Sequence, residues 1–103
     1  MKDVIILVML SGEQIICKGE YKDGQNDGVI PHYDVDDPHV IIPQELDGKL
    51  AVGFSPWIRF SKSTNLKISE TAIVAAAEPI DSIKKAFVEQ TSKIATPPPG
   101  SVS

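Results

Sequence analysis

The residues with the most reactive side chains are a single cysteine, Cys17, and two histidines that bracket an acidic stretch, His32 and His39. On a β-strand, His32, Asp34 and Asp36 would share one face and offer nitrogen and oxygen ligands to a divalent ion. The same pattern is more typical of a solvated outer face that leads into a turn, and no second ligand cluster accompanies it. We therefore predict no metal and no cofactor.

Catalysis needs a nucleophile or base held beside an orienting group. Cys17 follows two isoleucines, which predicts that it is buried and behaves as a small apolar residue. Cys17, His32 and His39 fall on different predicted strands, and no spacing makes them converge. The sequence also has no glycine-rich phosphate loop, nucleophile-elbow motif or paired-acid pattern. The chain is not expected to be an enzyme.

Trp57, Arg59 and Lys62 cluster near one predicted turn. An aromatic ring beside cations is how proteins stack single-stranded bases and contact their phosphates. Trp and Arg are equally typical of subunit contacts, and this second interpretation is favoured. The cluster therefore leaves nucleic-acid binding and self-association open.

The bulk properties restrict the partners. The 103 residues suit one domain, and the net charge of −4 gives no general attraction to phosphate backbones or anionic membranes. A single cysteine excludes a disulfide within the chain and favours a reducing compartment. The apolar run near the start is too short for a membrane span and is a poor signal peptide. We expect a cytoplasmic protein with no membrane partner.

The stretch from Val4 to Tyr21 organises the predicted fold. It contains two β-branched apolar runs separated by Ser11 and Gly12, which predicts a hairpin. The first run is apolar on both faces, so neither face can be left to water. Gly19 lies within the second run, where a glycine indicates a sharp bend or a close backbone approach. A small barrel is built in this way.

Further apolar runs indicate the remaining strands, over 29–35, 40–43, 50–61 and 66–77. Pro56 makes the third of these an edge strand or a bulged one. In the fourth, Ser69 to Thr71 could cap a helix, but a strand is preferred for 72–77. The chain thus divides into a β-barrel over 1–78, a C-terminal amphipathic helix over 79–95 that begins at Pro79, and a disordered proline-rich tail over 96–103.

About five bent strands and one helix suit an Sm-like barrel, an SH3-like barrel or an OB-fold. Three stretches decide among them: Leu10 to Gly12 with the later Gly19, Asp37 to Pro43, and Phe54 to Phe60 with its Pro-Trp pair. In these the sequence resembles the Sm-like family, most closely the small Sm-like proteins of tailed phages that infect cyanobacteria. The resemblance implies a mainly β fold: a small, strongly bent, five-stranded antiparallel Sm-like (SH3-like) barrel, here with a C-terminal helix.

The resemblance also implies a homo-oligomeric ring in the cytoplasm of an infected bacterium, with five to seven copies joined through strands 50–61 and 66–77. The residues expected at the subunit contact are Phe54, Trp57, Ile58, Phe60, Ile73 and Val74. In one alternative the ring binds single-stranded RNA, with contacts from Gln25, Asn26, Arg59 and Lys62. In the other it is a structural or protein-interaction platform of a phage that binds no nucleic acid, as the acidic balance favours.

Overall fold

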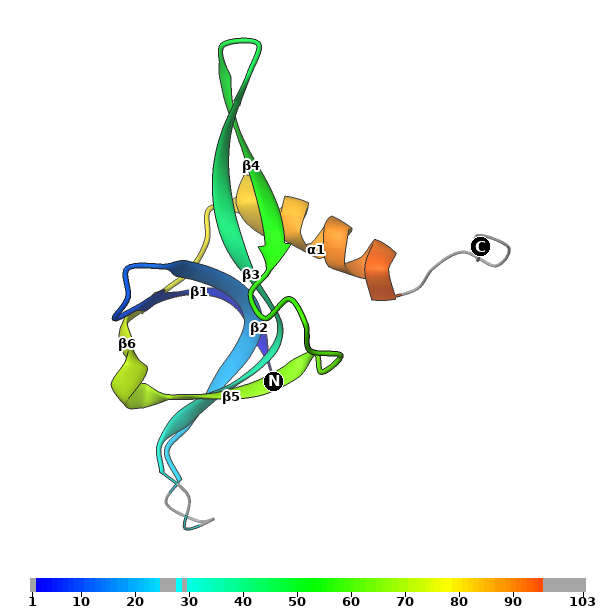
Figure 1. Cartoon of the computed structure of the whole chain (residues 1–103). Coiled ribbons are helices and arrows are strands. Elements are labelled where there is room, and N and C mark those ends of the chain that lie inside the picture. Colours follow the sequence, from blue (N-terminus) through cyan, green and yellow to red (C-terminus); the bar gives the residue numbers. More distant parts are fainter. Residues whose placement is uncertain (1, 25–27, 29, 96–103) are drawn as a thin grey trace.

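The computed structural model describes residues 2–24, 28 and 30–95 (Figure 1). Gln25, Asn26 and the predicted tail over 96–103 lie outside the described residues. The fold is mainly β, with one antiparallel sheet of six strands and a C-terminal helix. The elements are β1 (Asp3–Met9), β2 (Gln14–Lys22), β3 (His32–Leu46), β4 (Lys49–Pro56), β5 (Asn65–Ser69), the 3₁₀ turn η1 (Glu70–Ala72), β6 (Ile73–Ala77) and α1 (Asp81–Ala95).

The sheet is organised around the long strand β3. The strand order is β4-β3-β2-β1-β6, and β5 also pairs with β3. The first part of β3 pairs with β5, and the part from His39 to Leu46 pairs with β4. Between these two ladders lies Asp37, whose φ of 53° is rarely adopted by a non-glycine residue. Figure 1 shows the sheet strongly curved. Among the described residues β4, β5 and β6 each pair with one strand only, so the ladders do not close the sheet into the predicted barrel.

Two tight turns with glycine join neighbouring strands, and the one predicted at Ser11 and Gly12 is confirmed. β1 and β2 pair antiparallel across Ser11 and Gly12, and Gly12 has a φ of 93°. β3 and β4 are joined by Asp47 and Gly48, both with positive φ (53° and 76°). Positive φ at both central residues is the type I′ geometry, which matches the right-handed twist of the flanking strands.

The strand boundaries differ from prediction in three places. Runs 29–35 and 40–43 belong largely to one continuous strand, β3, whose pairing with β2 shifts register at Asp37 and Pro38. The run 50–61 ends as a strand at Pro56, which has no N–H for a ladder. The run 66–77 is split by η1, because the Ser69 hydroxyl accepts a hydrogen bond from the N–H of Thr71 (3.3 Å). The predicted cap at Ser69 therefore produces only the short 3₁₀ turn η1, and the alanine run forms the strand β6.

The helix begins at Asp81, two residues later than predicted. The Ile80 carbonyl accepts hydrogen bonds from the N–H groups of Ile83 (3.1 Å) and Lys84 (3.0 Å), so the first turn is built on Ile80. Pro79 precedes this turn rather than opening it. The predicted helix is confirmed over most of its length.

β1 and β2 each contribute buried residues to both faces of the sheet, as the two-sided apolar pattern of the first run predicts for β1. One face forms a cluster of Leu7, Met9, Ile15, Cys17, Val35 and Ile68. The other face forms a second cluster, in which Val4 and Ile16 pack with Phe87 from α1. The helix therefore covers the face of the sheet that carries Val4 and Ile16, opposite to the face that carries the first cluster.

Candidate functional site

The segment 57–64 joins β4 to β5. Both of its ends are hydrogen-bonded to Asp37 and Pro38, which form the bend of β3. The N–H of Trp57 donates to the Pro38 carbonyl (3.0 Å), and the Thr64 carbonyl accepts from the N–H of Asp37 (2.7 Å). Between these two anchors the segment carries Arg59 and Lys62 and no acidic residue. It is thus a cationic element on a chain whose net charge is −4.

The cations of this segment are not neutralised by neighbours. No ion pair joins Arg59 or Lys62 to another residue in the part of the chain that the structure describes. Both side chains are exposed. They are therefore available to a phosphate, a carboxylate or an aromatic face supplied by a partner.

Phe60, rather than Trp57, is the ring that the segment presents to solvent. Phe60 is 101% exposed and Ile58 is 44% exposed. Trp57 is half-buried against the first core cluster, and its Nε1 donates to Glu13 Oε1 (3.4 Å). Phe54 points to the other cluster, where its ring meets that of Phe87 edge-on at 5.8 Å. The expected contact residues therefore divide into inward ones (Phe54, Trp57) and outward ones (Ile58, Phe60).

A hollow of about 440 Å³ lies between this segment, the bend of β3 and α1. Its apolar wall is made by Pro38, Pro56, Ile58 and Leu66. Its polar lining is Asp37, His39, Arg59, Ser61, Ser63, Thr64 and Thr91. Apolar walls with a few convergent polar groups are typical of ligand pockets.

A second hollow, of about 310 Å³, lies against the first residues of β6. It is lined by Tyr21, Tyr33 and Glu70 together with Ile73, Val74, Ala75 and Ala76. The two tyrosine rings are 5.3 Å apart, and the Tyr21 hydroxyl donates to Glu70 Oε2 (3.1 Å). Partial desolvation, the bond to Glu70, and the charges of Glu70 and Asp23 raise the pKa of Tyr21. This hollow is therefore aromatic and negatively charged.

Sequence reasoning missed the Tyr21–Tyr33–Glu70 group, because its members lie far apart in the sequence. Tyr21 meets Tyr33 through the β2–β3 register, and β5 carries the chain back to Glu70. A correct pairing of β2 with β3 would have joined the two tyrosines. Nothing in the sequence marks Glu70 as their neighbour.

The outer edge of the sheet at β6 is apolar and exposed. Val74 is 63% exposed, and Ala75, Ala76 and Ala77 are exposed as well. Ile73 is half-buried against the first core cluster. Of the two contact residues predicted on this strand, Val74 therefore faces solvent and Ile73 partly faces the core.

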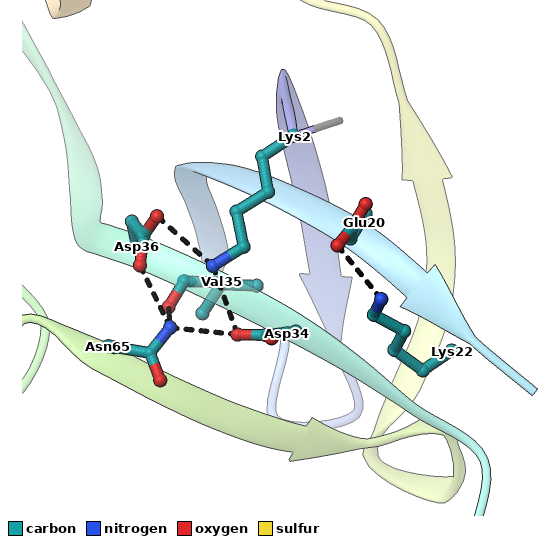
Figure 2. Close-up of polar contacts among 7 residues, drawn as sticks. All are labelled: Lys2, Glu20, Lys22, Asp34, Val35, Asp36 and Asn65. Atoms are coloured by element: carbon teal, nitrogen blue, oxygen red, sulfur yellow. Dashed lines mark hydrogen bonds and ion pairs between the residues drawn. The ribbon is translucent and has the colours of Figure 1, made fainter. Parts of the chain in front are cut away.

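The acidic face of β3 is occupied by the chain's own donors (Figure 2). Lys2 Nζ lies 3.1 Å from both Asp34 Oδ1 and Asp36 Oδ2. The Asn65 amide donates to both carboxylates at 2.8 Å, and to the Val35 carbonyl at 3.2 Å. No group of three or more His, Cys, Asp or Glu side chains suited to a metal occurs within the described residues.

The three candidate catalytic residues are held separately. Cys17 is buried in the first core cluster, and burial raises the pKa of its thiol to about 12. His32 and His39 lie seven positions apart on β3 and pair with different strands, β5 and β4. Each is anchored locally, because Nδ1 of His32 donates to the Ile30 carbonyl (2.9 Å) and Nδ1 of His39 to the Asp37 carbonyl (2.8 Å).

The predicted RNA-contacting residues include two that can be located. Arg59 and Lys62 lie on segment 57–64, beside the bend of β3, whereas Gln25 and Asn26 fall outside the described residues. Lys22, the last residue of β2, pairs with His32 at the end of the β3–β5 ladder that lies away from segment 57–64.

No protein-family model matches the chain, and a search of curated proteins found no match either. Within the described ranges, no helix has the length and apolar character needed to cross a membrane.

Proposed function

We propose that this chain is a non-catalytic, ring-forming Sm-like protein that serves as a protein-interaction platform, of the kind found in phages of cyanobacteria. Its curved sheet would close as an Sm-like barrel within a ring of five to seven copies. In this arrangement β4 of one copy pairs with β6 of the next, so that the outer edges of these two strands are covered.

The observation that carries the proposal is the character of the outer strands β6 and β4. β6 is apolar, and its side chains from Val74 to Ala77 are exposed. β4 leads into a segment with exposed Ile58 and Phe60. Long apolar edges invite pairing with another chain, and proteins that remain monomeric usually protect them with charges, bulges or covering elements.

The non-catalytic part of the proposal rests on the separate anchoring of Cys17, His32 and His39. A thiol whose pKa is raised to about 12 is protonated near neutral pH and is a poor nucleophile. Neither histidine lies within reach of the other along β3. A protein-interaction platform needs no nucleophile and base held close together.

Multi-angle light scattering tests the assembly. The expected mass at micromolar concentration is five to seven times that of one chain, and a clean monomer would overturn the proposal. Val74→Lys places a charge on the β6 edge and should shift the population toward smaller species. Ile80→Lys makes the same change at a residue that is 70% exposed but lies outside the sheet, and should leave the mass unchanged.

Single-stranded RNA binding is the second candidate, and segment 57–64 favours it. An exposed aromatic ring between two cations is a stacking platform with phosphate contacts on either side. In this alternative, Phe60 stacks on a base while Arg59 and Lys62 meet the backbone.

The RNA alternative is tested by titrating uridine-rich and adenine-rich single-stranded RNA at two salt concentrations. Saturable binding that weakens with salt would support it. Phe60→Ala and Arg59→Ala should then each weaken binding while the ring mass stays the same. If no saturable binding is seen at either salt concentration, the platform function remains.

A further inference from the structure

We infer that Arg59 of one copy binds in the hollow formed by Tyr21, Tyr33 and Glu70 of the next copy, and that this contact selects the register of assembly. The inference rests on the proposed pairing of β4 with β6. It adds to that proposal a named contact to which each copy contributes one half.

The direction of the strands brings the two halves together. In an antiparallel pair the C-terminal end of one strand lies beside the N-terminal end of the other. β4 ends at Pro56 and continues into Arg59, whereas β6 begins at Ile73, directly after Glu70 to Ala72. Every pairing within the sheet is antiparallel. The same arrangement between copies therefore sets the cationic segment of one beside the acidic hollow of the other.

The chemistry of the two halves is complementary. Arg59 is exposed and has no ion partner among the described residues. Tyr21 is 47% exposed, which leaves its ring accessible. A planar guanidinium stacks on a tyrosine face and donates to a carboxylate at the same time. In the described part of the chain, the Glu70 carboxylate accepts a hydrogen bond only from Tyr21, through Oε2, so it can accept more.

Apolar contacts flank this ionic one. Phe60 follows Arg59 and is 101% exposed, and Val74 lines the same hollow as Glu70 and is 63% exposed. Pairing Phe60 of one copy with Val74 of the next would remove both from water. Glu70 thus lies beside exposed apolar side chains, just as Arg59 lies beside Phe60. The two surfaces are opposite in charge and both partly apolar.

A contact between Arg59 and Glu70 of the same chain is excluded by β5. Segment 57–64 is anchored at Asp37 and Pro38. Glu70 follows the five residues of β5, about 17 Å of extended strand further on. Asn65 and Ser69 pair with opposite ends of the first part of β3, Asp36 and His32. A second copy is therefore needed to complete the group.

Charge reversal tests the inference. Glu70→Lys and Arg59→Glu each place like charges across the contact, so each should raise the concentration needed for half-assembly by at least about tenfold. The double variant Arg59→Glu with Glu70→Lys restores opposite charges and should recover most of the assembly. Sedimentation velocity over a concentration series measures all three, and circular dichroism melts report whether each variant is folded.

Two further variants keep the test decisive. Glu78→Lys makes the same charge reversal just beyond the other end of β6, and should weaken assembly less than Glu70→Lys because Arg59 lies away from that end in antiparallel pairing. Glu70→Gln still accepts the bond from Tyr21, and should weaken assembly less than Glu70→Lys.

The outcomes separate the inference from the proposed function. A wild-type ring that is unaffected by Glu70→Lys and Arg59→Glu, or single-variant losses that the double variant does not rescue, would overturn the inference and leave the ring standing. A loss with Glu78→Lys but not with Glu70→Lys would also overturn it. A monomeric wild type would overturn the proposed function itself.

Discussion

β2 and β6 are separated only by β1 in the same sheet, yet apolar side chains are buried on β2 and exposed on β6. On β2, the consecutive residues Ile15, Ile16 and Cys17 are all fully buried, although they alternate between the two faces. On β6, Val74 and the alanines are exposed. The strands differ in what lies beside them. β2 has a strand on each side, with the core on one face and α1 on the other, whereas β6 has a strand only on the side of β1.

The contrast separates folding from association. The burial of Ile15, Ile16 and Cys17 on β2 is complete within one chain, so changes at these residues should alter the stability of every copy. The exposed surface of β6 and of segment 57–64 contributes little to the fold of one chain. Changes there should act on assembly and leave the fold intact.

The largest effect should come from Cys17, which reports on the buried strand. Burial raises the pKa of its thiol to about 12, against an ordinary value near 9. The thiolate fraction near neutral pH should then fall by about a thousandfold. Labelling with a thiol reagent should therefore be very slow in the native protein and fast in urea. Labelling of the native protein at the unfolded rate would show that the β2 face opens freely.

A pair of identical substitutions tests the contrast directly. Phe87→Ala removes a fully buried ring at the centre of the second cluster, and should cost about 3–5 kcal/mol of unfolding free energy. Phe60→Ala removes a fully exposed ring, and at low protein concentration should change the stability by less than about 0.5 kcal/mol. Urea unfolding followed by circular dichroism measures both. Equal losses at the two positions would contradict the division between fold and surface.

A smaller effect is expected where the strands approach each other closely. A Cβ at Gly19 would lie 2.9 Å from Cγ1 of the buried Val35 and 3.1 Å from Cδ1 of the half-buried Ile5. Gly19→Ala should therefore destabilise the protein by about 1–3 kcal/mol through overpacking.

Gly53→Ala is the matched control for that prediction. Its Cβ would lie 2.8 Å from Gln44 Nε2, the flexible end of an exposed side chain that can move aside. The same urea experiment should show almost no change. A tolerated Gly19→Ala would mean that β2 can shift away from β3 at this point.

Much of the interior could be predicted from the sequence, because its signals are local. The apolar pattern of Val4 to Tyr21, the two turns with glycine and the helical spacing of α1 each depend on neighbouring residues. The contribution of β1 to both faces of the core followed directly from that pattern. The split of the last strand at η1 was harder, because the Ser69 cap competes with the strand preference of its flanks.

The candidate site was less predictable, because exposure depends on the fold around a residue. Phe54, Trp57 and Phe60 are all aromatic and close in sequence. Only the structure shows that Phe54 packs on Phe87, that Trp57 bonds to Glu13 and that Phe60 faces solvent. The hydrogen bond between Tyr21 and Glu70 likewise depends on long-range strand pairing, which no pattern of neighbouring residues predicts.

The smallest effect should come from the acidic face of β3, a polar counterpart of the buried strands. Hydrogen bonding from Asn65 and the nearby Lys2 cation hold the pKa of Asp34 below its ordinary value, although partial burial opposes this shift. A carboxyl group with a lowered folded-state pKa stabilises the fold above its unfolded pKa, and this contribution is lost as the pH falls through the folded value. Asp34→Asn should therefore lower the stability by about 0.5–1 kcal/mol at pH 7, with the difference from wild type shrinking below about pH 4. Thermal melts across this range measure the difference, with Glu45→Gln, an exposed acid beside the β3–β4 turn, as a control that should show none. A gap between wild type and Asp34→Asn that stays constant down to pH 2.5 would mean that the side chain acts through its shape and hydrogen bonds rather than through its charge.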